Sequence, residues 1–423
     1  MKKFSYPKTF LLGFGFFGVS VIWAIYNAYV PLMLDGRFGL SAAWIGFFMV
    51  LDNIAAVLIQ PAVGAWSDRL RTPIGRRMPF ILVGAPIGAI AFGLLPLAAG
   101  LPLFVMAAGT VLLSMALWRT PVIALMPDIT PSEYRSQANG IINFMGGLGS
   151  VISFSLGSLL YAKNEAYAFW LGSALVILGG ALVLIFLKEP QEYSTKTGPR
   201  KDTHIVESIR AVFMEEEKSA ARLLLAILLW FLSWYAVETF FTLFAVNHLG
   251  LTAADSGFQL TYVSLIFLIF AIPSGYIAAR FGRRRTIMTG IVLMTICIAS
   301  MYFIPVNALV GVKLASLTKV AGLYPVSLIL MAAGFAWSLI NINSLPMVVD
   351  MTEDEHVGTY TGLYYFMSQT AAIVGPVVFG GVVQIFNNNY SLMMLLSPIF
   401  LVGAWFMMLG VRRGEAKNFN PQV

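Results

Sequence analysis

Residues 64–80 read GAWSDRLRTPIGRRMPF. This stretch sets five charges between two long apolar runs: Asp68, Arg69, Arg71, Arg76 and Arg77. A shorter version, SGYIAARFGRRRTI, follows at residues 274–287. Charge gathered between long apolar runs is typical of a loop that joins two membrane-spanning helices. Its recurrence indicates that the chain contains an internal repeat.

The composition lies outside the range of soluble globular proteins. Of the 423 residues, 58% are hydrophobic and only 11% are charged, and the mean hydropathy is +0.80. A membrane-spanning helix needs about 20 apolar residues, so the chain has room for about a dozen. Its single cysteine, Cys297, excludes an intramolecular disulfide and a thiol metal site. The net charge of +7 indicates basic cytoplasmic loops that face anionic lipid.

Apolar runs separated by charged or turn-rich breaks predict an all-α integral membrane protein. The twelve expected spans cover 10–34, 42–66, 80–99, 102–126, 137–160, 166–187, 221–246, 256–279, 287–305, 321–348, 359–385 and 391–411. One long polar break, 188–220, divides them into an N-terminal six-helix bundle (1–187) and a C-terminal six-helix bundle (221–423). Within this linker, apolar residues at helical spacing predict an amphipathic helix on the cytoplasmic surface: Ile205, Ile209, Val212 and Phe213.

The distribution of basic residues predicts the orientation. With the N-terminus inside, only four of the 27 Lys and Arg residues fall on external segments: Arg37, Lys163, Lys313 and Lys319. The positive-inside rule therefore places both termini in the cytoplasm. We expect a multi-pass protein of the cell inner (plasma) membrane.

A second pair of motifs supports the repeat. Four residues of the first half recur in the second half at one constant offset. Asp350, Gly362, Phe366 and Met367 correspond in this way to Asp128, Gly140, Phe144 and Met145. Both basic loops also lie between a second and a third helix of six. The two halves are therefore expected to be parallel six-helix repeats with the same end inside.

Two parallel six-helix repeats and this loop resemble the major facilitator superfamily. The pattern Gln60-Pro-x-x-Gly-x-x-Ser-Asp-Arg, followed by Gly75-Arg-Arg-x-Pro-Phe-Ile, resembles the sucrose/proton symporters and the related glycoside-pentoside-hexuronide:cation symporters. The resemblance implies a substrate site near the midplane, lined by the first, fourth, seventh and tenth helices, and transport by alternating access. It covers the first half well, whereas the second half shares topology and repeats.

The sequence departs from these families at several positions. Plant sucrose symporters carry an arginine and an aspartate in the fourth helix where this chain has Ile123 and Leu112, and its own arginine is Arg119. The paired second-helix aspartates of melibiose-type relatives fall on Ala56 and Gln60. Coupling to a proton is therefore expected rather than coupling to sodium.

The opening loop is predicted to act as a cytoplasmic latch. Glycines permit a close approach and a tight turn, and Asp68 can pair with an arginine or cap a helix. The predicted gating residues are Gly64, Asp68, Arg69, Gly75, Arg76, Arg77, Asp128, Arg135 and Asp350. A simpler interpretation is that the arginines only orient the chain and bind lipid.

Three charged residues lie deep inside the expected spans: Asp52, Arg119 and Glu238. Buried charges in a membrane are costly and mark functional sites. A carboxylate whose proton affinity depends on a moving arginine can couple a proton to a substrate. Glu238, in the seventh helix, is the favoured proton carrier, and Asp52 is expected to be a gate or charge partner. The alternative is a static ion pair that fixes helix packing.

Amides, indoles and phenols suited to sugar hydroxyls and ring faces accompany these charges. The predicted substrate-binding residues are Trp23, Tyr26, Asn27, Asn53, Trp118, Arg119, Asn143, Trp234, Tyr235, Trp337, Asn341 and Gln369. Asn343 is a further polar candidate. For any single aromatic residue, helix packing or an interfacial position is the simpler interpretation, and the amides can equally join helices.

The expected function is import of a glycoside, with a disaccharide such as sucrose or maltose as substrate, in symport with a proton. The alternatives are a cation-coupled efflux antiporter and a non-transporting sensor on the same fold. An enzyme is not expected, because no catalytic or phosphate-binding motif is present and His204, His248 and His356 fall in loops. We expect no cofactor, no metal and no nucleic acid. The expected partners are a sugar, a proton and the lipid bilayer, with the protein itself as a monomer.

Overall fold

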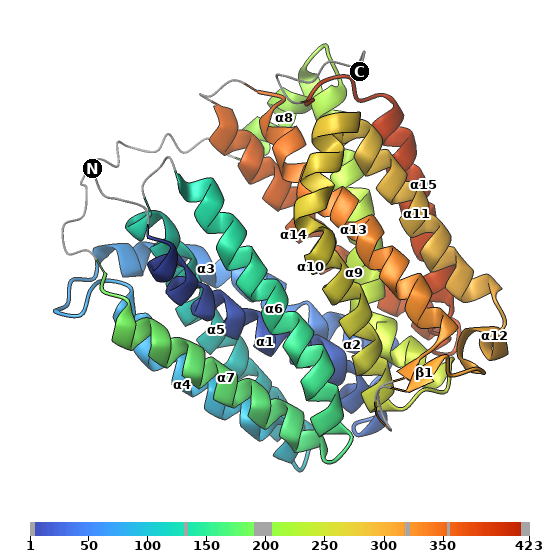
Figure 1. Ribbon diagram of the computed structural model, residues 1–423, viewed down its shortest axis with the longest axis horizontal. Coiled ribbons are helices and arrows are strands. Elements are labelled where there is room, and N and C mark those ends of the chain that lie inside the picture. Colours follow the sequence, from blue (N-terminus) through green and yellow to red (C-terminus); the bar gives the residue numbers. More distant parts are fainter. Residues whose placement is uncertain are drawn as a thin grey trace. The chain divides into compact units, whose positions relative to one another are not determined.

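The computed structural model consists mainly of long helices (Figure 1). It describes residues 5–130, 134–189, 205–316, 318, 322–352 and 356–415, without the side chains of Ser136, Ile205, Val206 and Ser208. Within these residues, twelve spans are long and apolar enough to cross a membrane. The predicted all-α membrane fold with twelve helices is confirmed.

The first six spans form the N-terminal half of the chain. Several of their helices have a proline in the first turn, where the backbone needs no N–H donor: Pro7, Pro79 and Pro102. The elements are α1 (Tyr6–Gly36), α2 (Ala42–Met49), α3 (Leu51–Arg69), α4 (Met78–Leu94), the 3-10 turn η1 (Leu95–Leu97), α5 (Leu101–Ile129), α6 (Arg135–Tyr161) and α7 (Glu165–Phe186).

The last six spans follow the linker. The elements are α8 (Ile205–Met214), α9 (Ser219–Asn247), α10 (Ala253–Phe281), α11 (Arg283–Phe303), α12 (Val306–Val310), the antiparallel strands β1 (Ala315–Ser316) and β2 (Gly322–Leu323), α13 (Pro325–Val349), α14 (Val357–Ile385) and α15 (Leu392–Leu409). The tenth span therefore begins at Pro325, four residues later than predicted, because Gly322 and Leu323 belong to the hairpin.

The second span is interrupted at Val50. Its backbone N–H bonds to the carbonyls of Phe47 and Phe48, which tightens the last turn of α2 before α3 starts at Leu51. The predicted second span over 42–66 is nevertheless present as one membrane span, Ala42–Arg69. Within it, Asp52 lies in the first turn of α3.

The described residues form two compact units. Unit 1 comprises those within Met1–Gly39, Leu51–Thr197 and Ala253–Thr261. Unit 2 comprises those within Leu40–Val50, Gly198–Thr252 and Tyr262–Val423. The border at Val50 therefore assigns α2 to unit 2 and α3 to unit 1. The bundle boundaries predicted at residues 187 and 221 remain a prediction about the sequence repeats.

Each unit is built by long helix–helix contacts. In unit 1, α1 packs on α6 and α7, and α4 packs on α5 and α7. In unit 2, α9 packs on α14 and α15, and α11 packs on α13 and α15. Large apolar side chains remain exposed on several spans, among them Leu58, Ile185 and Ile272. In a membrane, such side chains contact lipid tails, so the exposed apolar surface is the expected exterior of this class of protein.

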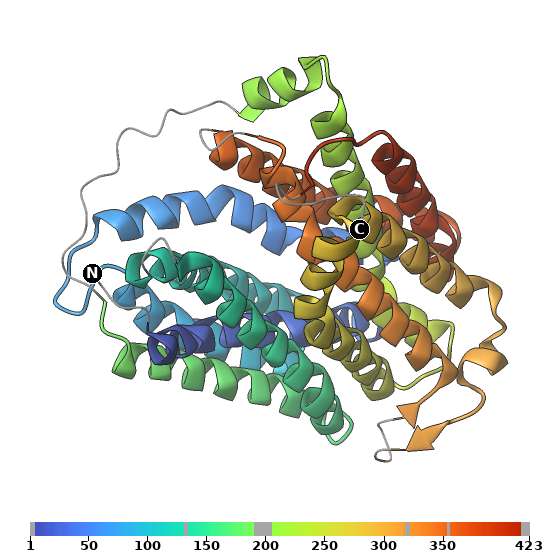
Figure 2. The same cartoon turned by 45° about the horizontal axis from the view of Figure 1, so that its top comes forward.

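Helix α8 lies within the linker, and in Figure 2 it is the bright-green helix at the top that precedes α9. Val212 is 3% exposed, and the helix contacts α9 and α14. Just beyond α8, Glu215 accepts a hydrogen bond from Tyr360 Oη at 2.9 Å and pairs with Arg413 at 3.0 Å. The linker is thereby joined to α14 and to the segment that follows α15.

Candidate functional site

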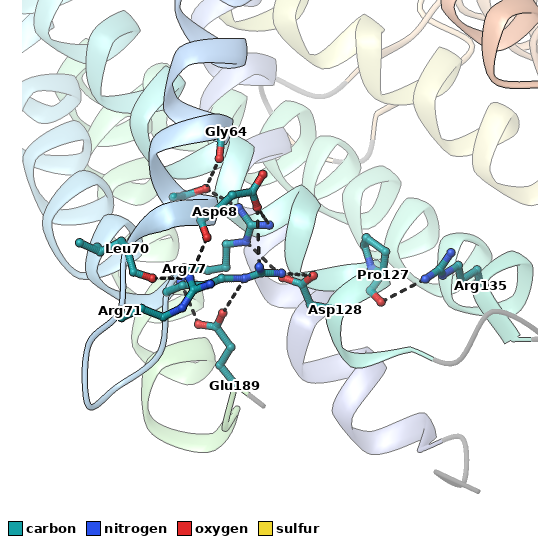
Figure 3. Close-up of polar contacts among 11 residues, drawn as sticks. Gly64, Asp68, Leu70, Arg71, Arg77, Pro127, Asp128, Arg135 and Glu189 are labelled. Carbon is teal, nitrogen blue, oxygen red and sulfur yellow. Dashed lines mark hydrogen bonds and ion pairs between the residues drawn. The ribbon is translucent and has the colours of Figure 1, made fainter. Parts of the chain in front are cut away.

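The loop between α3 and α4 gathers two of its arginines around two carboxylates (Figure 3). Arg77, which is 4% exposed, forms ion pairs with Asp68 and with Asp128, the latter at 3.1 Å. It also donates a hydrogen bond to Ser67 Oγ. Arg76 donates to Asp128 Oδ1 at 2.6 Å. Four predicted gating residues are thus brought together by α3, the loop and the end of α5.

Glu189 completes this cluster from beyond the end of α7. Its buried carboxylate accepts a hydrogen bond from the backbone N–H of Arg77 at 2.9 Å and lies 3.7 Å from Arg76 Nε. Gly75 has a φ of +118°, and a Cβ there would collide with the Glu189 carboxylate. Only glycine therefore fits the turn. The anion also stabilises the N-terminus of α4.

The second half repeats the arrangement. Arg283 pairs with Asp350, and Glu415 accepts hydrogen bonds from the backbone N–H groups of Arg283 at 2.6 Å and Arg284 at 3.0 Å. Ala279 occupies the place that Asp68 has in the first loop, so this copy lacks that carboxylate. Sequence reasoning missed Glu189 and Glu415. Each follows the last span of its repeat, and this shared position is the signal that could have revealed them.

Three other predicted gating residues lie outside these ion pairs. The Gly64 carbonyl accepts a hydrogen bond from Ser67 Oγ at 2.9 Å. Arg135 is exposed and donates to the Pro127 carbonyl at 3.5 Å, and Arg69 is exposed at the end of α3. Within the described part of the chain, none of the three belongs to an ion pair.

The Asp52 carboxylate interacts with Asn53 of its own helix and, electrostatically, with groups of two other helices of unit 1. The Asn53 amide donates a hydrogen bond to Asp52 Oδ1 at 2.8 Å. The Arg119 guanidinium of α5 and the Tyr26 phenol of α1 both interact electrostatically with the Asp52 carboxylate. Two of the three predicted coupling residues, Asp52 and Arg119, therefore belong to one cluster, whereas Glu238 lies in unit 2.

Tyr26 is the most buried member of this cluster. Its side chain is 1% exposed, and its hydroxyl makes no hydrogen bond with any described residue. The buried indole N–H of Trp23 is in the same situation, and the two rings meet edge to face with centroids 5.7 Å apart. Leaving a buried donor without an acceptor is unfavourable, so both groups are suited to an oxygen atom of a ligand. Asn27 is half-buried on the same helix.

Trp118 lies in the packing between α5 and α4. It is fully buried, and its indole N–H donates to Met115 Sδ at 3.2 Å. A Cβ at Gly84 would lie 2.8 Å from Trp118 Cβ, so the missing side chain lets the two helices approach closely. Trp118 therefore supports α5 at the turn that carries Arg119.

Aromatic residues gather in unit 2. Trp234 of α9 stacks on Trp337 of α13, with parallel rings 4.1 Å apart. Phe231 packs edge to face on Trp337, with centroids 5.4 Å apart, and stacks on Tyr235. Glu238 follows one turn after Trp234 and is half-buried. The predicted aromatic residues of the seventh and tenth spans thus form one group between α13 and α9, and α9 also carries Glu238.

The remaining polar candidates are dispersed. Asn143 is exposed and donates to the Asn139 carbonyl of its own helix at 2.9 Å, whereas Asn341 and Gln369 are half-buried. Asn343 is 3% exposed and donates to Ser274 Oγ at 2.9 Å, which joins α13 to α10. Among the described residues, no group of three or more His, Cys, Asp or Glu side chains is arranged to hold a metal ion.

Several curated proteins resemble part of this chain. The general alpha-glucoside permease of Schizosaccharomyces pombe is 27% identical over 159 residues, which are 34% of this chain and 28% of that protein. The sucrose transport protein SUC3 of Arabidopsis thaliana is 25% identical over 33% of this chain and 27% of its own length. The human proton-associated sugar transporter A is 30% identical over 43% of this chain and 25% of its own length. The matched segment therefore spans about a quarter of each relative.

Solved structures match the whole fold. A bacterial homolog of the human lysosomal transporter Spinster, in an inward-facing and occupied conformation, has a TM-score of 0.70 at 14% identity and covers 96% of this chain and 97% of its own. The nucleoside transporter NupG, solved as a point mutant, has a TM-score of 0.74 at 15% identity and covers 96% of this chain and all of its own. The sequence profile of the Major Facilitator Superfamily matches residues 12–318 and 246–423. The chain therefore belongs to the Major Facilitator Superfamily, a non-enzymatic class of membrane transporters.

Proposed function

We propose that this protein imports a glycoside, such as the disaccharides sucrose and maltose, in symport with a proton by alternating access. The observation that carries the proposal is the cluster of Asp52, Arg119 and Tyr26, which combines an acid, a cation and a buried hydroxyl that makes no hydrogen bond to any described residue. Three partial relatives, an alpha-glucoside permease, a sucrose transport protein and a proton-associated sugar transporter, support the same class of substrate and coupling ion.

The chemistry of the cluster suits both ligands. A carboxylate inside a membrane span can bind a proton and so remove the cost of its buried charge. Arginine and phenol donors can then bind sugar oxygens, and aromatic rings such as Trp234 can cover an apolar sugar face. We assign the Asp68, Arg76, Arg77 and Asp128 ion pairs to gating, because their breakage would release the loop between α3 and α4. The same assignment extends to Asp350 in the second half.

We further propose that the protein is a monomer of the cell inner (plasma) membrane with both termini in the cytoplasm. The clustering of Arg76, Arg77, Arg283 and Arg284 in loops of the same predicted side supports this orientation. The orientation is measured by tagging each terminus and testing whether a membrane-impermeant reagent labels it in intact cells. Labelling of either terminus from outside would contradict the assignment.

Uptake into proteoliposomes tests the proposed function. The purified full chain is reconstituted and offered a panel of radiolabelled disaccharides, with an imposed proton gradient, an imposed sodium gradient or no gradient. Accumulation of a disaccharide that follows the proton gradient is expected. Accumulation that follows sodium alone would contradict proton coupling and keep the sugar. Outward transport of cationic dyes without sugar uptake would favour an efflux antiporter, and binding without flux would favour a sensor.

A further inference from the structure

We propose that Arg413 is a positioning residue for the ion pair of Arg283 and Asp350. It fastens residues 410–415, the segment that follows α15, to the linker, and this segment in turn holds Arg283 in place. The inference rests on the gating role proposed for Asp350, and it adds the linker as the element on which the strength of that ion pair depends. All the residues of this network belong to unit 2.

The first set of contacts fastens the segment to the linker. The Arg413 guanidinium forms ion pairs with Glu215 at 3.0 Å and with Glu217 at 2.5 Å. Each carboxylate has a further donor: Tyr360 Oη donates to Glu215 at 2.9 Å, and Ser219 Oγ donates to Glu217 at 2.5 Å. A single ion pair at the surface is weak. A cation shared by two carboxylates that are themselves held by hydrogen bonds is more firmly placed.

The second set of contacts fixes the turn at Gly414. Its φ is +96°, and a Cβ there would lie 2.6 Å from the Met347 carbonyl oxygen in the last turn of α13. Only glycine therefore fits this turn. Because the turn is packed against α13, the backbone after Arg413 has a fixed direction. A displacement of Arg413 is passed on to Glu415, two residues later.

The third set of contacts holds the gating pair. Glu415 accepts hydrogen bonds from the backbone N–H groups of Arg283 at 2.6 Å and Arg284 at 3.0 Å. The Gly414 carbonyl accepts a hydrogen bond from Arg283 Nη1 at 3.4 Å, and the same Nη1 pairs with Asp350. Both the backbone and the guanidinium of Arg283 therefore depend on the segment. Displacing the segment weakens the pair with Asp350.

The first half holds its basic loop without such an arginine. Glu189 accepts a backbone hydrogen bond at the start of α4, as Glu415 does at the start of α11. Two residues before Glu189 stands the buried Leu187, at the place that Arg413 has in the second half. Leucine cannot form an ion pair, so this type of loop is held without a cation at that place. Arg413 therefore supplies a connection to the linker that the repeat itself does not require.

Turnover and sugar binding of full-chain variants in proteoliposomes test the inference. Arg413→Gln should lower the turnover of each binding-competent molecule about threefold, the scale of one exposed ion pair, and leave the sugar dissociation constant unchanged. Arg413→Lys keeps the charge and should restore most of the turnover. Arg412→Gln is the matched control, because it removes the same charge from an exposed neighbour that forms no ion pair within the described part of the chain. It should behave as the wild type.

A double-mutant cycle with Asp350→Asn tests whether Arg413 acts through the gating pair. Arg413→Gln should change turnover little once Asp350 is replaced, because residues that act through shared partners are not additive. Effects on turnover that simply multiply would overturn the inference. So would a purely structural outcome, in which Arg413→Gln lowers the melting temperature and the amount of binding-competent protein but leaves the turnover of each molecule normal.

Melting temperatures of the four proteins of the cycle give a readout that needs no sugar. If the wild type transports no sugar under any gradient, the proposed function falls, and the network is then decided by these temperatures alone. Shifts for Arg413→Gln and Asp350→Asn that are smaller together than their sum support the connection. Shifts that add would overturn it. If the wild type transports sugar and the cycle is additive, only this inference falls.

Discussion

At the scale of single residues, Asp68 distinguishes the two basic loops. Its carboxylate pairs with the buried Arg77 but is itself 56% exposed, and the equivalent residue of the second loop is Ala279. Arg77 keeps Asp128 and Ser67 as partners when Asp68 is removed. We therefore expect the aspartate to be dispensable for folding and available for a role that only one loop plays.

We predict that Asp68→Ala slows sugar uptake several-fold and leaves equilibrium sugar binding unchanged. Because the Asp68 side chain is exposed and the buried Arg77 keeps its pair with Asp128, we expect a loss of about 1 kcal/mol of stability, and the protein should remain folded. Uptake and equilibrium binding measured on the same preparation decide the point. Glu165→Ala is the matched control, because it breaks a half-exposed ion pair with Arg37 at 2.6 Å on the opposite predicted side. Parallel losses of binding and uptake would exclude a gating role for Asp68.

A pH effect is predicted at Glu217. The Ser219 hydroxyl donates to its carboxylate at 2.5 Å, and Arg413 lies 2.5 Å away. These contacts hold the pKa of Glu217 below its usual value. Because the folded pKa is the lower one, the contribution of Glu217 to stability is present above the ordinary glutamate pKa of 4.5 and is lost as pH falls below it.

Glu217→Gln should therefore lower the melting temperature more at pH 7 than at pH 4. Thermal unfolding in detergent at both pH values measures this difference. Glu216→Gln, the neighbouring glutamate, provides the baseline. An equal shift of the Glu217 variant at both pH values would mean that the ionised carboxylate does not stabilise the fold.

The sequence predicted residue types better than it predicted partners. Asp52 and Arg119 stood out because charge inside a span is rare, and the structure places them in one cluster. Asn53 was expected to face the sugar, yet its amide donates to Asp52. Glu189 was missed because it is distant in sequence from Arg77 and carries no motif of its own. Hydrogen bonds between distant segments depend on helix packing, which periodicity does not specify.

At the scale of elements, close helix contacts depend on glycine. In unit 2, a Cβ at Gly380 of α14 would lie 2.5 Å from the Ala42 carbonyl and 3.1 Å from the Phe240 ring. A Cβ at Gly46 of α2 would likewise lie 2.3 Å from the Pro376 carbonyl oxygen. The adjacent Gly381 has no atom within 4 Å of the equivalent point. Packing therefore requires a glycine at position 380 but not at position 381.

We predict that Gly380→Ala destabilises the protein by about 1–3 kcal/mol, the usual cost of inserting a methyl group into a packed contact. The backbone of α2 would have to move, because the colliding atom is a carbonyl oxygen and not the end of a flexible side chain. Gly381→Ala should be neutral or slightly stabilising, since alanine favours helices. Melting temperatures of the two variants test the pair, and equal values would refute the packing argument.

The elements themselves were largely predictable. Hydropathy located all twelve spans, because a helix that crosses lipid must be apolar over most of its length. Their ends were predicted less closely: α1 begins at Tyr6 and α10 at Ala253, a few residues outside the expected limits. The interruption at Val50 has no signal in residue type, since apolar residues flank it on both sides. It depends on which neighbours each half of the span packs against.

At the scale of the whole molecule, the repeat predicts equivalent roles for Glu189 and Glu415. Each accepts backbone hydrogen bonds at the start of the third helix of its half, at Arg77 and at Arg283. We expect Glu189→Gln and Glu415→Gln to lower the melting temperature by similar amounts, because each removes one negative charge from a helix N-terminus, worth about 0.3–1 kcal/mol and more when buried.

The double variant provides the check. The two sites are remote in sequence and lie in different units, so their effects on the free energy of unfolding should add. A large effect at one site and none at the other would mean that the two halves hold their loops by different means, despite the repeated sequence.

The interruption at Val50 also has a consequence for biosynthesis. The α2 segment leaves the ribosome early, yet its packing partner α14 is made roughly 300 residues later, which at 5–20 residues per second takes on the order of 15–60 seconds. During this wait the glycine face of α2 can rest only against lipid or against the insertion machinery. Unit 2 therefore closes only when most of the chain has been made, and a chain that stalls before residue 357 leaves α2 without its partner α14. Such a nascent chain would be open to membrane proteases for as long as translation pauses.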